Sequence, residues 1–524
     1  MESDVVIAGA GPNGLMLACE LALAGVRPLV LERLTGPSSE QRANGLVGQI
    51  VRMIDRRGLY ERLSGTPGPP LPVPRFMFAA FPVNFGELPD NPVYVQLVPQ
   101  RRIEEVLAER AAELGVEIRR GHELVGLSQR DDAVTVEVSG PQGRYAVQGR
   151  YLVGADGGHS VARKLAGIDF PGVTNDRTVS RAAHVRVPKE LIDPATGGLA
   201  VPGYGVVPPF LHHRTERGLV AFAPFPDGRT LLNVSEIADP DFDAPFTIAE
   251  LRAAARRVLG ADIEVQEPEG PGPHMLRRLA GGNTRLAERF RAGRVLLVGD
   301  AAHVHSAIGG NGLNLGLQDA INLGWKLAAE VQGWAPPGLL DSYEAERRPA
   351  GERVTMHTMA QGVLVGPGRE VTALRTLFGE LLEERTTVQH IADMISGADI
   401  RYDHMGRWAP DITLHRDSGP TRLAELTRTA RPLLLDMTGD GDLAAEVGPW
   451  LDRVDVVTGY GMTDCTERSE GQEGMPGRLS DDTKATAMLL RPDCYVAWES
   501  ESSQPDGAAL RAALARWFGP GQPV

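Results

Sequence analysis

The chain has 524 residues, of which 42% are hydrophobic and 23% are charged, which is typical of a globular protein and predicts about three domains. Its formal net charge of -14 argues against the broad basic face that nucleic-acid binding requires. The three cysteines (Cys19, Cys465 and Cys494) form no CxxC pair and no ligand-like cluster, so the sequence indicates neither a metal site nor a disulfide framework and favours a reducing, cytoplasmic setting. The apolar N-terminus lacks the positive start of a signal peptide, and no apolar run reaches the length of a membrane span.

The first 32 residues predict a strand, a helix and a second strand. Residues 4–8 are a short β-branched run, residues 13–24 have a helical composition, and residues 27–32 form another apolar run that ends in Glu32. Between the first strand and the helix lie Gly9, Gly11 and Gly14, where the chain must turn tightly and where a helix N-terminus attracts phosphate. The carboxylate of Glu32 can accept hydrogen bonds from ribose hydroxyls. The pattern predicts dinucleotide binding, and a tight turn whose glycines serve only packing is the alternative.

Three later segments place glycine directly after an apolar run. Residues 151–160 (YLVGADGGHS) predict a strand followed by a turn at Asp156, and residues 294–303 (RVLLVGDAAH) predict a strand followed by Asp300. Residues 309–319 (GGNGLNLGLQD) lead into a predicted helix. Glycines at a helix start leave backbone N–H groups exposed, which suits the electron-rich carbonyl edge of a ligand.

Between the segments at residues 151–160 and 294–303, the sequence predicts an antiparallel sheet. Its β-like runs cover residues 181–187, 203–207, 218–223 and 230–234. Four nearby side chains are candidates for lining a substrate pocket, with core or surface roles as the alternative: Phe210, His212, Phe222 and Phe225. Arg214 is expected to be a solvated loop charge. After residue 400, short strands and a closing helix over residues 507–518 predict a further domain.

The glycine-containing segments, in this order, resemble the single-component FAD-dependent aromatic hydroxylases, and most of all their branch acting on polyketides and antibiotics. The resemblance covers nearly the whole chain and includes VPQR at residues 98–101, DSYEAERRP at 341–349 and LRPDCYVAW at 490–498. It implies an α/β fold in which a Rossmann-like FAD-binding domain is combined with an antiparallel-sheet substrate domain and a thioredoxin-like C-terminal domain without CxxC. The implied domains are residues 1–175 and 276–395 (FAD binding, the latter with additional helices), 176–275 (substrate) and 400–524 (C-terminal).

The resemblance also implies a set of FAD-binding residues. They are Gly9, Gly11, Pro12, Asn13, Gly14, Glu32, Arg33, Arg42, Gln100, Asp156, Asp300, Gly310, Gly312, Leu313 and Asn314. A guanidinium fork such as that of Arg42 complements phosphate, and Asp300 is expected to accept a hydrogen bond from a ribityl hydroxyl. The alternatives are a surface charge for Arg33 or Arg42, a helix cap for Gln100, and a turn residue without a ligand for Asp156.

Two features distinguish the predicted flavin edge. Relatives commonly carry proline where this chain has Ala307, and this change restores a backbone N–H and loosens φ. Ala307, Gly309 and Gly310 are expected to shape the edge, while the sequence names no acid or base catalyst. His303 and His305 alternate without a third ligand nearby, so packing or capping is favoured over metal binding.

The implied activity is monooxygenation. FAD would take electrons from NADPH or NADH, react with O2, and hydroxylate a polycyclic aromatic, polyketide-like substrate through a flavin C4a-hydroperoxide. Baeyer–Villiger oxygen insertion and epoxidation with rearrangement are alternatives within this chemistry. A FAD-binding protein without oxygenase activity is the alternative from a different class. The sequence leaves open the substrate, the choice between NADPH and NADH, and the oligomeric state, with a homodimer among the options.

Overall fold

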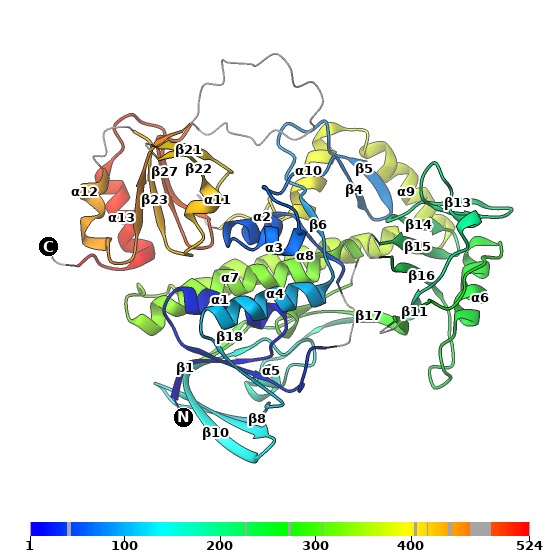
Figure 1. Cartoon of the computed structure of the whole chain (residues 1–524), viewed down its shortest axis with the longest axis horizontal. Helices are drawn as coiled ribbons and strands as arrows, with labels where there is room; N and C mark the ends of the chain where they lie inside the picture. Colours follow the sequence, from blue (N-terminus) through cyan, green and yellow to red (C-terminus); the bar gives the residue numbers. More distant parts are fainter. Residues whose placement is uncertain are drawn as a thin grey trace.

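The computed structural model describes residues 2–38, 43–225, 228–270, 274–306, 308–402, 406–416, 418–438, 443–461 and 484–522. Two residues of the predicted site, Arg42 and Ala307, lie outside the described residues. Three groups of strands organise the chain: a first sheet around the N-terminal strand, a second antiparallel sheet, and a smaller C-terminal sheet (Figure 1).

The first sheet has a parallel core in the order β19-β10-β1-β2-β7. Its strands are β1 (Glu2–Ala8), β2 (Pro28–Glu32), β7 (Glu117–Arg120), β10 (Gly143–Gly154) and β19 (Val295–Leu297), joined at the margins by antiparallel β8 (Glu123–Gln129), β9 (Val134–Gly140) and β18 (Arg291–Ala292). Val5, Val6 and Ile7 are completely buried because both faces of β1 are covered. The predicted strand–helix–strand unit at the N-terminus is confirmed.

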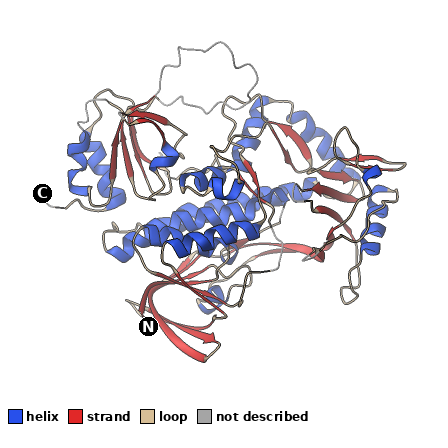
Figure 2. Ribbon diagram, viewed as in Figure 1, coloured by secondary structure: helices blue, strands red, loops and turns tan. Residues whose placement is uncertain are grey.

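Long helices form a layer on one face of this sheet (Figures 1 and 2). They are α1 (Pro12–Leu23), α4 (Gln100–Glu113) and α7 (Asn311–Gln332). Short helices α2 (Gln49–Arg56), α3 (Tyr60–Ser64) and α5 (Val161–Leu165) and strands β3 (Gly45–Val47) and β6 (Val95–Leu97) complete this part. Gln100 is the first residue of α4, whose N-cap is Pro99, so the helix begins one residue earlier than the sequence indicates.

The second sheet is antiparallel, in the order β14-β15-β16-β11-β17-β20. Its strands are β11 (Gly172–His184), β14 (His212–Thr215), β15 (Gly218–Pro224), β16 (Thr230–Ile237), β17 (Leu276–Leu286) and β20 (His303–Val304). Helix α6 (Ile248–Leu259) packs on one face, over the completely buried Val220, Leu232 and Val234. The antiparallel sheet is confirmed, but the predicted run at residues 203–207 lies outside it, because its strand β13 (Gly205–Val207) pairs with β12 (Leu199–Val201) in a separate hairpin. The sheet also takes β17 from beyond residue 275. The run LRRLAGGNTRL carries two glycines and few β-branched residues, so its sequence gives little strand signal.

Further helices and hairpins border the second sheet. They are α8 (Ser342–Leu364), α9 (Arg369–Leu381) and α10 (Arg385–Ser396), with β4 (Arg75–Phe78), β5 (Phe81–Asn84), β12 (Leu199–Val201) and β13 (Gly205–Val207). The β4–β5 hairpin packs against α9, where Phe378 stacks on Phe78 at a ring-centroid distance of 5.8 Å. This cluster makes one apolar core from residues that are nearly 300 positions apart.

The C-terminal sheet has the order β24-β23-β26-β27. Strands β23 (Leu433–Asp436) and β24 (Asp455–Thr458) are parallel, whereas β26 (Ala487–Leu490) and β27 (Val496–Ser500) are antiparallel, and helices α12 (Leu443–Val447) and α13 (Gly507–Phe518) accompany them. This strand–helix–strand followed by two antiparallel strands and a helix is the expected thioredoxin-like pattern. Strands β21 (Thr413–Arg416), β22 (Gly419–Arg422) and β25 (Tyr460–Gly461) and helix α11 (Leu423–Leu426) stand beside it.

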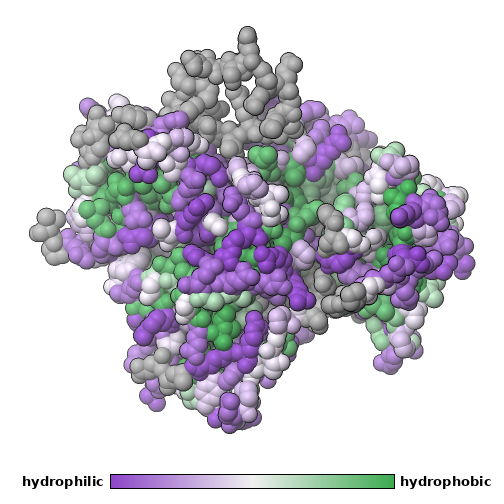
Figure 3. Space-filling view, in the orientation of Figure 1, coloured by the Kyte–Doolittle hydropathy of each residue, from purple (hydrophilic) through white to green (hydrophobic). Residues whose placement is uncertain are grey.

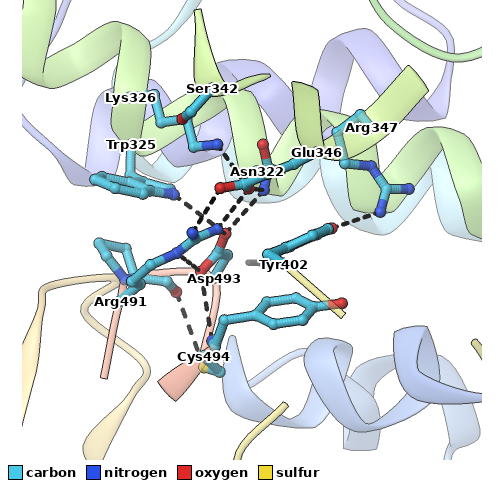
Figure 4. Close-up of polar contacts among 12 residues, drawn as sticks. Asn322, Trp325, Lys326, Ser342, Glu346, Arg347, Tyr402, Arg491, Asp493 and Cys494 are labelled. Atoms are coloured by element: carbon cyan, nitrogen blue, oxygen red, sulfur yellow. Dashed lines mark hydrogen bonds and ion pairs between the residues drawn. The ribbon is translucent and has the colours of Figure 1, made fainter. Parts of the chain in front are cut away.

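A buried cluster of charges joins the C-terminal sheet to α7 and α8 (Figure 4). Arg491 donates from Nε to Asp493 at 3.0 Å and from Nη1 to Glu346 at 2.7 Å, and Lys326 donates to the same Glu346 carboxylate at 2.7 Å. The four side chains are almost completely excluded from solvent. Two acids and two bases therefore compensate one another inside this contact.

On the face seen in Figure 3, hydrophilic side chains are interspersed with smaller apolar patches. Within the described residues, no helix combines the length and the apolar character needed to cross a membrane. The same part of the chain contains no group of three or more His, Cys, Asp or Glu side chains arranged to hold a metal ion.

Candidate active site

A continuous cavity of about 2920 Å³ runs from the glycine turn after β1 to the open face of the second sheet. Most of the predicted FAD residues line it: Gly9, Gly11, Pro12, Asn13, Glu32, Arg33, Gln100, Asp156, Asp300, Gly310, Gly312 and Leu313. Gly14 and Asn314 are not part of the wall. Residues far apart in the sequence thus meet at one site, as the resemblance implies.

The glycines between β1 and α1 differ in what surrounds them. A Cβ atom on Gly9, whose φ is +107°, would lie 2.4 Å from the carbonyl oxygen of Ala155, and one on Gly14 would lie 2.0 Å from the carbonyl oxygen of Gly9. A Cβ on Gly11 would meet no atom of the described chain within 4 Å, although Gly11 faces the cavity. Packing therefore requires glycine at positions 9 and 14, whereas at position 11 the absent side chain leaves room for a ligand beside the N-terminus of α1.

The Glu32 carboxylate is fixed at the end of β2. Its Oε2 accepts from the N–H of Ala10 and its Oε1 accepts from the N–H of Leu34, both at 2.8 Å. Two backbone donors hold the carboxylate at the cavity wall, and each oxygen keeps further acceptor capacity for ligand hydroxyls.

A buried carboxylate that the sequence analysis did not single out supports the turn at Asp300. Asp319, on α7, accepts from the N–H of Gly299 at 3.1 Å, from His303 Nε2 at 2.6 Å and from Arg347 Nε at 2.8 Å. Burial alone would raise the pKa of Asp319, but the charges and hydrogen bonds of His303 and Arg347 lower it. The ionised carboxylate thus anchors the turn that presents Asp300 to the cavity.

The structural role that its sequence left open for Asp156 is observed. Its Oδ2 accepts from the N–H groups of Val161 and Ala162, at 2.7 and 3.0 Å, and so stabilises the start of α5. The residue also borders the cavity, although its Oδ1 is buried and has no hydrogen-bond partner among the described residues. A contact of Asp156 with the cofactor stays a prediction.

The glycine-rich start of α7 forms another part of the wall. Gly309 and Gly310 have φ values of +80° and +71°, a left-handed conformation that glycine adopts without strain. Asn314 donates to the carbonyl oxygen of Gly310 at 3.0 Å and accepts from the N–H of Val47 at 3.2 Å. Its amide therefore holds the glycine turn in place from behind the wall.

Gln100 reaches the cavity from the first turn of α4. It donates to Glu104 at 2.8 Å and accepts from the N–H of Ala43 at 3.4 Å. The amide thereby stabilises the segment that follows the undescribed residues 39–42.

Of the four candidates for the substrate pocket, three fit the wall. His212 faces the cavity, with its pKa lowered by burial, and Phe210 packs edge-on against Phe225 at 5.8 Å between ring centroids. Phe222 borders the cavity, but its side chain is completely buried in the core beneath α6, because the alternation of β15 turns Ala221 and Ala223 toward the cavity instead. The core role is thus the one that Phe222 fills.

Arg214 is not the solvated charge that its sequence suggests. Its guanidinium donates to the carbonyl oxygens of Gly366 and Gly368, at 3.0 and 2.8 Å, and to Thr372 Oγ1 at 2.6 Å. It therefore ties β14 to the turn between α8 and α9, a contact between distant segments that the sequence alone does not indicate.

Comparison with known proteins identifies the family of this chain. The family model described as an FAD binding domain matches residues 2–358, and the model described as the C-terminal region of aromatic-ring hydroxylases matches residues 403–521. The chain belongs to the FAD-dependent aromatic hydroxylases. Its cofactor is accordingly FAD, and its family is one of flavin-dependent monooxygenases.

Individual relatives match this chain over nearly their whole length. A 12-dehydrotetracycline 5-monooxygenase/anhydrotetracycline 6-monooxygenase from Streptomyces rimosus is 43% identical, with 99% of each chain covered. The solved structure of an anhydrotetracycline hydroxylase from Streptomyces rimosus superposes with a TM-score of 0.83 at 41% identity, covering 99% of this chain and 100% of that one. A dialkyldecalin synthase from Streptomyces rugosporus is 37% identical, with 99% of this chain and 100% of the relative covered.

The residues of this chain fit FAD on physical grounds. The space beside Gly11 and the N-terminus of α1 suit a pyrophosphate, and the fixed carboxylate of Glu32 suits ribose hydroxyls.

Two histidines of the chain stand near the glycine-rich start of α7. His305 donates from Nδ1 to the carbonyl oxygen of Ser306 at 2.9 Å, and its Nε2 is buried without a partner among the described residues. Burial lowers the pKa of His305 and of His357 to about 4, and the charges of neighbouring histidines, His303 and His305 respectively, would act in the same direction. Both rings are therefore neutral at pH 7, which agrees with the packing role favoured for His305.

Proposed function

We propose that this FAD-dependent enzyme uses O2 and a reduced nicotinamide, NADPH or NADH, to hydroxylate a polycyclic aromatic, polyketide-like substrate. The observation that carries the proposal is the single cavity, in which the glycine turns that fit FAD open directly onto the broad face of the second sheet. The tetracycline-type substrates in the names of the Streptomyces rimosus relatives, at 43% and 41% identity, support this substrate class.

The chain's own residues would bind and orient the cofactor. We assign the pyrophosphate to the turn around Gly11, the adenosine ribose to Glu32, and the ribityl chain to Asp300, which Asp319 holds in place. FAD, when bound, supplies the redox chemistry, since it can accept two electrons from a nicotinamide and pass one oxygen atom of O2 to a substrate. The protein contributes orientation and exclusion of water.

The open face of the second sheet suits a flat, fused-ring substrate. Small side chains, Ala182 of β11 and Ala221 of β15, lie on the two strands that flank β16 in its middle, and Leu219, Leu231 and Leu279 surround them on the same wall. The small residues in the centre leave a flat recess for the fused rings of a substrate, and the larger apolar residues around this recess can bury the surface of those rings.

The test is NAD(P)H consumption by the FAD-loaded enzyme with and without a panel of hydroxylated fused-ring aromatics. We expect at least one compound to accelerate consumption, with matching O2 uptake and a product that gains one oxygen atom. Carbonyl carbon NMR separates hydroxylation from Baeyer–Villiger insertion, since only insertion converts a ketone into an ester. Consumption that stays at the substrate-free rate throughout the panel contradicts the proposal.

A second candidate is catalysis in the same cavity without oxygen transfer. The observation that favours it is the 37% identical relative that is named a synthase and not an oxygenase. In that case the FAD-loaded enzyme would convert its substrate in the absence of both nicotinamide and O2, and the product would keep the mass of the substrate. Anaerobic incubation followed by mass spectrometry distinguishes the two candidates.

A further inference from the structure

The cavity face of the second sheet carries a polar strip among apolar residues. Along β16, Leu232, Val234 and Glu236 are buried, so the alternating residues Asn233 and Ser235 turn to the opposite face, where both line the cavity. Ser180 of β11 lies directly opposite Ser235 and also lines the cavity. We call Ser180, Asn233 and Ser235 the polar strip.

The strand register leaves Asn233 unshielded. The row across the sheet through this residue reads Arg277, Ala182, Asn233, Ala221 and His212, and every member of the row lines the cavity. Alanine on both neighbouring strands has no side chain long enough to cover the carboxamide. Asn233 is therefore the polar residue in the middle of this row. The charged or titratable side chains of the row, Arg277 and His212, lie only at its two ends.

Two hydroxyl groups fix the orientation of this carboxamide. Asn233 donates from Nδ2 to Ser180 Oγ at 2.8 Å, and Ser235 Oγ donates to Asn233 Oδ1 at 3.1 Å. A carboxamide has two N–H donors and an oxygen with two lone pairs, so one donor and one acceptor position remain. The remaining lone pair can accept from a ligand hydroxyl, and the remaining N–H can donate to a ligand oxygen.

The geometry points to Asn233 as a specificity-determining residue that recognises a hydroxyl group on the edge of a fused-ring ligand. The amide oxygen accepts a hydrogen bond from the ligand hydroxyl. Ser180 and Ser235 are positioning residues that keep the amide in the orientation which recognises this hydroxyl. The inference rests on the proposed function for the substrate's shape and adds the functional group that is recognised.

Equilibrium binding to the FAD-loaded enzyme tests the inference without turnover. The probes are 2-hydroxyanthraquinone, whose hydroxyl is remote from the carbonyl groups and free to donate, and anthraquinone, which lacks the hydroxyl. We expect Asn233→Ala to weaken binding of the hydroxylated probe by about fivefold or more, the loss of one hydrogen bond, and to change anthraquinone binding by less than about twofold. An equal change for both probes overturns the inference, and so does an unchanged preference for the hydroxylated probe.

The chain offers a matched control in Asn283. This asparagine is on β17 of the same sheet and accepts from Thr174 Oγ1 at 2.7 Å, but it does not line the cavity. Asn283→Ala should leave both affinities unchanged. Ser235→Ala provides a second variant, because removing the hydroxyl frees the amide to rotate; it should lower the preference for the hydroxylated probe without abolishing FAD binding.

This binding test can succeed or fail independently of the test of the proposed function. The assay contains no nicotinamide, so a protein that never transfers oxygen still gives a readable preference between the two probes. A wild-type protein that binds both probes equally overturns the recognition by Asn233 even if it consumes NAD(P)H with another aromatic compound. If Asn233→Ala does not fold, the ratio of probe affinities in Ser235→Ala decides, and an unchanged ratio there counts against the inference.

Discussion

At the scale of single residues, the turn after β1 separates two reasons for glycine. Gly14 has no space for a side chain because the carbonyl oxygen of Gly9 lies within 2.0 Å of the position that a Cβ would take. Gly11 has space, and its φ of -72° is one that alanine adopts readily. Gly14 therefore serves the fold, and Gly11 leaves room for the cofactor that we assign to this turn.

The first prediction contrasts alanine at these two positions. Gly11→Ala should leave the unfolding free energy of the apoprotein unchanged or raise it by up to ~1 kcal/mol, while lowering the affinity for FAD by roughly tenfold or more. Gly14→Ala should lower the apoprotein's unfolding free energy by roughly 1–3 kcal/mol or more, because backbone must move. Urea denaturation of the apoproteins and titration with FAD measure both quantities. Equal loss of stability in the two variants would contradict the distinction.

At the scale of secondary structure elements, α8 connects three parts of the site. Near its start, Arg347 binds Asp319 on α7 and donates to the hydroxyl of Tyr402 at 2.7 Å. Near its end, Gln361 accepts from the N–H of Ala79 at 3.2 Å and donates to His357 Nδ1 at 3.2 Å. A single helix therefore aligns the turn that carries Asp300 with the hairpin between β4 and β5.

The second prediction concerns pH and His357 on this helix. Burial lowers the pKa of His357 from 6.5 to about 4, so the unfolded chain takes up a proton at a higher pH than the folded chain does. The contribution to stability is complete above pH 6.5 and is lost as the pH falls toward 4. Replacing His357 with Gln should reduce this acid loss by up to ~1.4 kcal/mol per pH unit. Urea denaturation between pH 7 and pH 4.5 measures the slope.

A His357→Gln variant whose unfolding free energy falls with acid as steeply as that of the wild-type protein would mean that the titration of buried His357 is not the cause.

Sequence patterns predicted elements better than they predicted the contacts between elements. The N-terminal unit followed from β-branched runs and glycine spacing, whereas β17 was missed because two glycines and several arginines conceal its alternation. Asp319 was missed as a functional residue because its partners, His303 and Arg347, are brought to it only by folding. A signal did exist: Asp319 and Lys326 are charged residues within the largely apolar stretch 315–329 of α7, and buried charges need partners.

At the scale of the whole molecule, the C-terminal sheet is coupled to the FAD-binding part by compensated charges. Arg491 and Asp493 come from the C-terminal part, and Glu346 and Lys326 come from α8 and α7 (Figure 4). Removing one charged side chain leaves its partner buried without an opposite charge, which lowers the free energy of unfolding. Removing an acid and a base together leaves the remaining pair neutral.

The third prediction concerns these two acids and two bases. Arg491→Met should lower the unfolding free energy by about 3–5 kcal/mol, because Asp493 and Glu346 lose their shared cation. Adding Asp493→Asn should restore part of this loss, since Glu346 and Lys326 still compensate each other and the asparagine oxygen can still accept from Asn322 and Trp325. Urea denaturation of the two single variants and the double variant measures the coupling. A double variant as unstable as the sum of the singles would contradict it.

The order of strands in the first sheet also has a consequence for biosynthesis. Strand β10 ends at residue 154, yet its parallel neighbour β19 begins only at Val295. A nascent chain that has left the ribosome up to residue 290 therefore exposes the unpaired edge of Leu152, Val153 and Gly154 while the second sheet is already being completed. For that interval of translation, this short edge is open to pairing with another strand until β19 emerges.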